Sequence, residues 1–130
     1  MNFEDIIARH IAVHSDDVMD LVGFSERAGG GGKYLILQRL HEFDGQDRAL
    51  GMDKVHVEIS DESRSCYGGI SEIVLFGDRI VFSFDERSSV ILGVDGWLNI
   101  KVDESLLASS GAIDFIARMC EPDGTNIIRK

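Results

Sequence analysis

The chain has 130 residues and a mass of 14.4 kDa, a size that suits one domain, so we expect a single domain over residues 1–130. Thirteen basic and 23 acidic residues give a net charge of −10. This balance argues against a nucleic acid or an anionic membrane as the main partner, because phosphate groups are bound by lysine and arginine. Hydrophobic residues make up 44% of the chain, which is enough for a core without disulfides.

Two cysteines, Cys66 and Cys120, lie far apart in the sequence and in no pattern typical of a metal knuckle or a secreted disulfide framework. We therefore expect two free thiols. The first residues carry acids before any apolar run, which is a poor signal peptide, and the apolar runs are far too short to span a membrane. We predict a cytoplasmic protein.

The N-terminal segment admits two interpretations. In a helix, one face would carry Phe3, Ile6, Ile7, His10, Ile11 and His14. In a strand, Ile7, Ile11 and Val13 would line one face, and Asp16-Asp17 would turn the chain into a second strand at residues 18–24. We favour the strand pair, because residues 18–24 contain β-formers and lead into glycines.

Runs of β-formers predict further strands at residues 33–40, 54–60, 70–76 and 79–85. The clearest is 54–60, in which Val55, Val57 and Ile59 alternate with polar residues. Such alternation is typical of a strand with one face in water.

Two dipeptides predict hairpin turns. Gly77-Asp78, between residues 70–76 and 79–85, is typical of a type II′ turn. Asp95-Gly96 favours a type I′ turn between strands at residues 90–94 and 97–102. Two hairpins in series indicate an antiparallel sheet.

Residues 110–120 have the best helix pattern, with an apolar stripe made of Ala112, Ile113, Ile116, Met119 and Cys120. Ser110 can cap the first turn, Asp114 lies near its positive end, and Pro122 with Gly124 stops the helix. Residues 121–130 are either an added strand or a loose tail. The predicted fold class is α+β: a mainly antiparallel β-sheet built from hairpins, with one C-terminal helix packed on it.

Three segments are predicted as loops: residues 29–32, 41–53 and 61–69. The glycine run at 29–32 lacks the Walker pattern and precedes a strand, so we interpret it as a flexible turn. Segment 41–53 has no clear period, and loops of that length are usually functional or mobile.

Reactive side chains form no recognisable catalytic or metal motif. His10 and His14 lack the glutamate of a zinc-binding HExxH helix, and Cys66 has no orienting group beside it. Asp44 and Asp47 lack the ligand spacing of a calcium loop. We therefore expect no catalytic residue, no metal and no cofactor, and we predict that the protein is not an enzyme.

An ordered set of short motifs is shared with a known family. Residues 34–39, YLILQR, are followed by Gly51-Met52, then Val57-Glu58-Ile59, then Tyr67-Gly68-Gly69-Ile70, then a hairpin that contains Leu75. This set covers residues 18–102 and resembles immunity protein family ten of bacterial polymorphic-toxin systems. The resemblance implies a small protein that binds a cognate toxin domain, neutralises it, and is encoded beside it.

The shared polar residues have two interpretations. Gln38, Arg39, Glu58 and Tyr67 could form a patch that faces the partner. Alternatively they are structural, with Glu58 paired to Arg39 on the sheet and Tyr67 at the sheet edge. We favour the structural interpretation, and we interpret Gly68 and Gly69 as conformational residues that allow a tight turn.

Binding residues concentrate in loops, so the toxin-facing surface is predicted there instead. The predicted partner-binding residues are Glu42, Asp44, Asp47, Asp61, Glu62 and Tyr67. The acids would attract a basic toxin and speed association, and Tyr67 would be the aromatic anchor. Phe43 and Trp97 are second choices.

Two other hypotheses remain open from sequence. One is a small ligand-binding domain or enzyme with a pocket near Glu58, His56 and Cys66. The other is a structural homodimer subunit that pairs exposed sheet edges, so the expected oligomeric state is either a monomer or a homodimer.

Overall fold

The computed structural model describes residues 5–30 and 32–130, and its strands form two five-stranded sheets. Sheet A contains, in spatial order, β1 (Asp5–Ala8), β9 (Trp97–Val102), β8 (Arg79–Phe84), β7 (Ile70–Leu75) and β10 (Asn126–Arg129). Sheet B contains β2 (His10–Ser15), β3 (Met19–Ser25), β4 (Tyr34–Leu40), β5 (His56–Ile59) and β6 (Asp61–Tyr67), in chain order.

Most strand pairs are antiparallel, as predicted. Sheet B is a meander in which each strand pairs with the next. In sheet A, β7, β8 and β9 are antiparallel neighbours, but β1 lies parallel to β9 and β10 lies parallel to β7. The α+β class is confirmed, with two sheets where one was expected.

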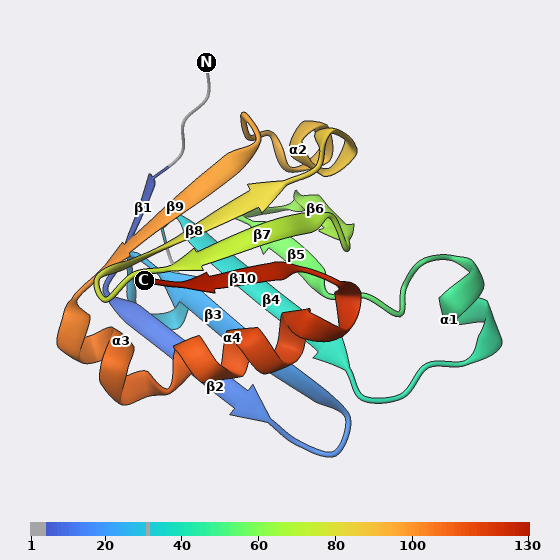
Figure 1. Cartoon of the computed structure of the whole chain (residues 1–130), viewed down its shortest axis with the longest axis horizontal. Coiled ribbons are helices and arrows are strands. Elements are labelled where there is room, and N and C mark those ends of the chain that lie inside the picture. Colours follow the sequence, from blue (N-terminus) through green and yellow to red (C-terminus); the bar gives the residue numbers. More distant parts are fainter. Residues whose placement is uncertain (1–4, 31) are drawn as a thin grey trace.

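The two sheets share one hydrophobic core. Inward-facing side chains of sheet B, such as Phe24 and Leu37, belong to the same buried cluster as Phe82 and Ile100 of sheet A. Because strand side chains alternate, every second residue of these strands enters the core. In Figure 1, α4 (Ala112–Cys120) runs across β2 and β3 and lies below β10.

The predicted C-terminal helix is confirmed, and a second helix precedes it. α3 (Glu104–Ser110) meets α4 at Gly111, whose φ of 73° turns the chain between them. The Ser110 hydroxyl accepts a hydrogen bond from the Ala112 amide at 3.1 Å. The short 3₁₀ helix η2 (Glu121–Asp123) ends at Gly124, and β10 follows, so the added strand was the correct alternative for the last residues.

Residues 90–94 do not form the predicted strand. They belong largely to α2 (Glu86–Leu92), so the hairpin predicted at Asp95-Gly96 is wrong. The Asp85 side chain caps this helix by accepting from the Ser88 amide at 2.8 Å, and Gly93 ends it with a φ of 72°. Capping residues at both ends outweigh the β-propensity of a short apolar run.

Residues 61–69 are likewise not a loop, because most of them form β6. This strand pairs with β5 through its backbone, and α2 packs beside it. An edge strand can carry polar side chains on its exposed positions, which removes the apolar signal that identifies a strand.

The preferred N-terminal strand pair is confirmed as β2 and β3, whereas the predicted face is only partly correct. Ile6 and Ala8 of β1 are buried, and Ile7 is 52% exposed. The chain changes sheets between β1 and β2, so one alternation does not run through both strands. Phe3 and Gly31 lie outside the described residues.

Glycines turn the chain at two of the predicted positions. Gly68 and Gly69 have φ values of 73° and 89°, so their conformational role is confirmed. A Cβ on Gly69 would lie 1.8 Å from the Ser88 hydroxyl oxygen. Gly77-Asp78 does turn β7 into β8, but Gly77 has no positive φ, so the predicted type II′ geometry is wrong.

Candidate functional site

One end of sheet B gathers several segments that are distant in the sequence. Met19 pairs with Leu40, Gln38 pairs with His56, and His56 pairs with Tyr67. This register places residues 16–18, residues 41–55 and the end of β6 at the same end of the sheet. We call these three segments the loop end of sheet B.

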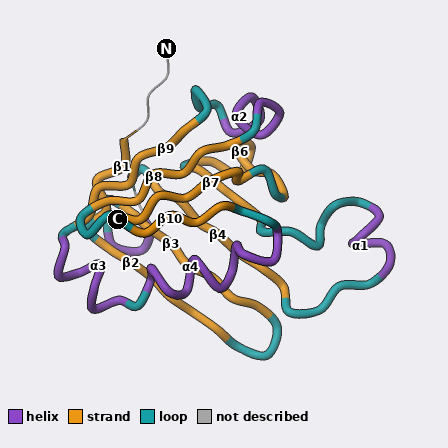
Figure 2. The backbone as a smooth tube through the Cα atoms, in the orientation of Figure 1, coloured by secondary structure: helices purple, strands orange, loops and turns teal. Residues whose placement is uncertain are grey.

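The segment that joins β4 to β5 stands out from both sheets and contains the short helix α1 (Gly45–Ala49) (Figure 2). Asp44 and Asp47 form a capping box: the Asp44 carboxylate accepts from the Asp47 amide at 2.8 Å, and the Asp47 carboxylate accepts from the Asp44 amide at 3.1 Å. None of the residues of α1 is buried. Two of the predicted partner-binding acids therefore have a structural task, namely forming this helix.

Arg39 holds the base of the loop against the C-terminal segment. Its guanidinium donates to the Asp123 carboxylate at 2.5 Å and to the Asp53 carbonyl at 3.3 Å. The second oxygen of Asp123 accepts from the Val55 amide at 2.8 Å. The side chains of Arg39 and Asp123 are only 16% and 10% exposed. This clip fixes where the β4–β5 segment leaves and re-enters the sheet.

The predicted pair between Arg39 and Glu58 is wrong. Glu58 accepts a hydrogen bond of 2.5 Å from the Tyr34 hydroxyl instead. Alternation in β4 and β5 puts Arg39 on the side of buried Leu37, and Glu58 on the side away from buried Val57. The two side chains therefore lie on opposite faces of sheet B.

A second tether joins the β4–β5 segment to the β2–β3 turn. The His41 ring lies 2.9 Å from the Asp20 carboxylate, and the His41 amide donates to the Val18 carbonyl at 2.8 Å. The hydrogen bond to Asp20 raises the pKa of His41 above its ordinary value. The contact brings the acids of the β2–β3 turn, Asp16 and Asp17, toward the predicted Glu42.

A shallow cleft of about 200 Å³ opens beside the loop on the outer face of sheet B. It is lined by Gln38, Leu40, Met52, Lys54, His56 and Tyr67. The rings of Tyr67 and His56 lie 4.8 Å apart, tilted by 60°. Tyr67 is 36% exposed, so the predicted anchor residue is held by a neighbour and still reaches solvent.

Exposed apolar side chains gather at this end. Of the seven large hydrophobic residues that are exposed among the described residues, four lie here: Val18, Leu40, Leu50 and Tyr67. Val18 and Leu50 are each 64% exposed. Neither residue was among those predicted from the sequence, although a single apolar residue between turn or loop residues is a usable signal. Apolar anchors with a charged rim are typical of a protein-binding surface.

Asp61 and Glu62 lie at the other end of sheet B, because Asp61 pairs with Ile59 and Ile59 pairs with Leu35 near the start of β4. The length of β4 separates the two ends by roughly 20 Å. The Asp61 carboxylate accepts from the Ser63 amide at 2.8 Å, which lowers its pKa. The six predicted residues therefore form two groups, of which Glu42, Asp44, Asp47 and Tyr67 are together.

The acids at that second end surround Tyr34. The hydrogen bond to Glu58 is the main cause that raises the pKa of Tyr34 to about 12, and burial and the charges of Asp61 and Glu62 act in the same direction. A phenol that stays protonated at neutral pH serves here as a hydrogen-bond donor.

Of the three residues named in the pocket hypothesis, Glu58, His56 and Cys66, only His56 lines the cleft beside the loop. Cys66 pairs with buried Val57 and packs against the core, whereas Glu58 is on the outer face. Burial raises the pKa of Cys66, and it raises the pKa of Cys120 to about 12, so both free thiols are poor nucleophiles.

The described part of the chain offers neither a cluster of metal ligands nor a helix that could span a membrane. His14 lies 2.8 Å from the Asp16 carboxylate, and no group of three or more metal-ligating side chains gathers there or elsewhere in residues 5–30 and 32–130. Within the same residues, no helix has the length and apolar character that a membrane crossing needs.

A model of the immunity protein 10 family matches residues 7–108, which include both sheets except β10 and the first half of β1. The chain belongs to the immunity protein 10 family. The resemblance carried by the YLILQR motif and its followers is thereby confirmed. No curated protein and no solved structure gives a significant match to the chain. The matched residues contain the whole loop end of sheet B.

Proposed function

We propose that this member of the immunity protein 10 family binds a cognate toxin domain and neutralises it, without catalysis of its own, through the loop end of sheet B. Family membership supports the general role. The observation that supports the location is the joint presence of Val18, Leu40, Leu50 and Tyr67 on an exposed, acid-rimmed surface. The cytoplasmic location and the oligomeric state, monomer or homodimer, remain predictions.

The charge of the surface favours a basic toxin face. The chain carries −10 overall, and Asp16, Asp17, Glu42, Asp44 and Asp47 all belong to the segments of the loop end. Complementary charge accelerates association and decreases in effect as salt is added. Rapid capture suits an inhibitor that has to act before the toxin causes damage.

The role is tested by co-expression with the toxin domain encoded by the neighbouring reading frame. The domain alone should kill the cells, and co-expression of this chain should restore growth and give a stable one-to-one complex. Death without rescue, when both proteins are well expressed, would contradict the proposal. A harmless neighbour would contradict it as well.

The location is tested by two matched charge reversals, Glu42→Lys and Glu62→Lys. Both glutamates are exposed, and their carboxylates make no hydrogen bond or ion pair with a described residue, but they lie at opposite ends of sheet B. Glu42→Lys should slow association and flatten its dependence on salt, measured by surface plasmon resonance, and Glu62→Lys should change neither. The opposite result would move the interface to the Tyr34 end.

The apolar anchors are tested by Tyr67→Ala and Leu50→Ala. Loss of a central anchor costs about 2 kcal/mol, so the complex should weaken by about thirtyfold for Tyr67→Ala. Val90→Ala is the control, because Val90 is 78% exposed on α2, which is not one of the segments of the loop end. Equal affinities for all three variants would exclude the loop end as the interface.

A further inference from the structure

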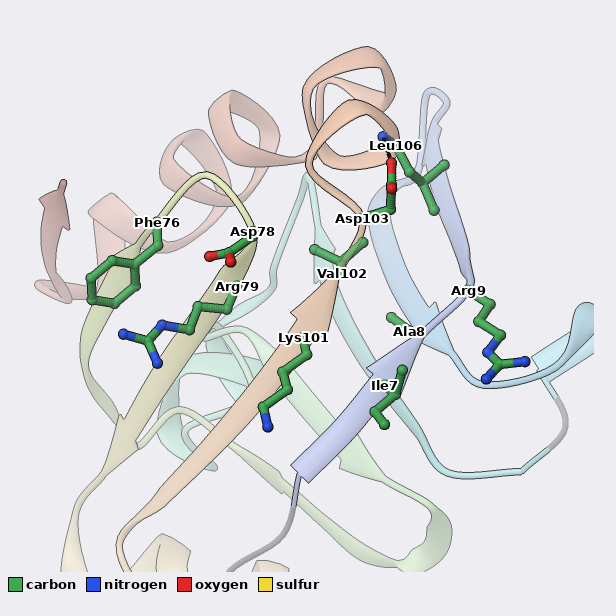
Figure 3. A pocket seen from close by; sticks show the side chains of 10 residues that line it. All are labelled: Ile7, Ala8, Arg9, Phe76, Asp78, Arg79, Lys101, Val102, Asp103 and Leu106. Carbon is green, nitrogen blue, oxygen red and sulfur yellow. Dashed lines mark hydrogen bonds between the residues drawn. The ribbon is translucent and has the colours of Figure 1, made fainter.

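The outer face of sheet A carries a groove of about 660 Å³ that the proposed toxin surface does not include. In Figure 3 its floor is formed by Ile7, Ala8 and Val102, and α3 closes its upper end with Leu106. Of these three residues, Ile7 is 52% exposed, whereas Ala8 and Val102 are buried. The floor therefore offers one exposed apolar side chain, that of Ile7.

Cations line both sides of this floor in a chain of net charge −10. Arg79 and Lys101 lie on one side and Arg9 on the other (Figure 3). They come from β8, from β9 and from the link between β1 and β2. The strand register aligns Ile7 with Lys101, and Lys101 with Arg79, in a single row across three neighbouring strands.

Arg79 and Lys101 are like charges placed directly opposite each other on an antiparallel pair. Such pairs destabilise a sheet, and natural chains keep locally unfavourable choices mainly at functional positions. The contacts that Arg79 and Lys101 make with other side chains relieve this repulsion only in part. Arg79 lies over the Phe76 ring at 4.3 Å, and Lys101 lies 3.4 Å from the Asp5 carboxylate in a pair that is about half exposed on each side.

The Asp103 carboxylate at the upper rim does not fill this role. Asp103 is the N-cap of α3, where it accepts from the Leu106 amide at 3.0 Å and from the Ser105 hydroxyl at 2.6 Å. Figure 3 shows its carboxylate directed at the helix, away from the ends of Lys101 and Arg79. A position between these two cations thus favours an external anion.

We propose that this groove is a second protein-binding site, which takes an extended segment carrying a carboxylate next to an apolar side chain. The carboxylate bridges Arg79 and Lys101, and the apolar neighbour packs on Ile7. A protein segment fits better than a nucleic acid, because Asp78 and Asp103 at the rim and the net charge of the chain repel a long polyanion.

The test uses the full chain labelled with ¹⁵N and a blocked hexapeptide of alternating glutamate and leucine as the probe. Titration followed by NMR should give saturable shifts at Ile7, Lys101 and Arg79. The same peptide with lysine in place of glutamate should not bind. Absence of saturable binding, equal binding of both peptides, or shifts confined to another face would overturn the proposal.

Variants separate the groove from general charge effects. Arg79→Gln and Lys101→Gln should each weaken peptide binding about tenfold, the value of one charge-assisted contact. Arg118→Gln is the matched control, because Arg118 also stacks on a phenylalanine, Phe115, at 4.8 Å, but on α4. An equal loss in Arg118→Gln would contradict a specific site.

Two other outcomes would also overturn the proposal as stated. Inorganic phosphate that displaces the peptide with equal or higher affinity would assign the groove to a small anion. Loss of toxin neutralisation in Arg79→Gln would make the groove part of the toxin interface. Because the groove and the loop end are on different sheets, failure of the peptide test leaves the co-expression test unaffected.

Discussion

Asp123 shows how one side chain can hold distant segments together. Its two carboxylate oxygens bind the Arg39 guanidinium and the Val55 amide, which belong to sheet B and its loop. Alternation along β4 dictates that Arg39 faces inward, so its partner has to come from across the core. The sequence contained no signal for this partner, because Asp123 is 84 positions away.

Asp123→Asn should destabilise the fold by about 3 kcal/mol, because it leaves the charge of Arg39 buried without a counter-ion. Urea unfolding measures this loss. The control is Arg129→Gln, which breaks the exposed pair of Arg129 with Asp114 at 2.9 Å and should cost at most about 1 kcal/mol. Equal costs for the two variants would show that the clip does not hold the fold.

His41 should give the loop end a dependence on pH. Its pKa is raised by Asp20, so protonated His41 stabilises the folded chain fully below the unfolded pKa of 6.5. That contribution is lost as the pH rises through the higher folded pKa. An NMR titration of the His41 ring should give a pKa above 6.5, and Asp20→Asn should lower it. A pKa that is the same in both proteins would contradict the tether.

At the scale of elements, capping and strand pairing decided whether a segment is helix, strand or loop where residue propensity was ambiguous. α2 replaced a predicted strand because Asp85 and Gly93 satisfy its ends, and β6 replaced a predicted loop because its backbone pairs with β5. α1 is the extreme case, since it buries none of its residues and depends on the capping box of Asp44 and Asp47. Capping residues were visible in the sequence, but pairing partners were not.

Asp44→Ala should unfold α1 locally and leave global stability nearly unchanged. Loss of a cap costs a helix about 1 kcal/mol, which exceeds what five exposed residues can retain. Amide exchange in residues 45–50 should become fast. The free energy of unfolding from urea titration should stay within about 0.5 kcal/mol of the parent value. Gln46→Ala, also exposed in α1, is the control and should keep the protection.

The capping role of Asp44 and Asp47 also decides how the proposed toxin-binding surface is probed. A charge reversal at Asp44 or Asp47 would remove the helix along with the charge. Glu42 carries no such structural task, so it reports charge alone.

For the whole molecule, the C-terminal segment lies outside the family match and completes the hydrophobic core. The match ends at residue 108, yet Phe115, Ile116 and Met119 of α4 are buried against both sheets. β10 then extends sheet A by pairing with β7, and the Thr125 hydroxyl donates to the Ile70 carbonyl at 2.9 Å. We therefore expect the chain to fold as one cooperative unit.

Deletion of residues 111–130 should abolish cooperative unfolding, because it exposes the core between the sheets and removes Asp123. Near-ultraviolet circular dichroism and urea titration measure the loss. Ile116→Ala tests the same point in a folded chain and should cost about 2–5 kcal/mol, whereas Val90→Ala should stay within about 0.5 kcal/mol. A truncated chain with an unchanged sharp transition would contradict a single core.

The sequence by itself determined the local pieces of this protein: the α+β class, most strands, the C-terminal helix and the family. Those features depend on periodicity, capping and short motifs, which act between neighbouring residues. Only the tertiary structure decided which elements meet. Four features depend on the register between distant segments, which no local pattern encodes. They are the parallel pairing of β1 with β9 and of β10 with β7, the Arg39–Asp123 clip, the separation of Asp61 and Glu62 from Glu42, and the facing cations of Arg79 and Lys101.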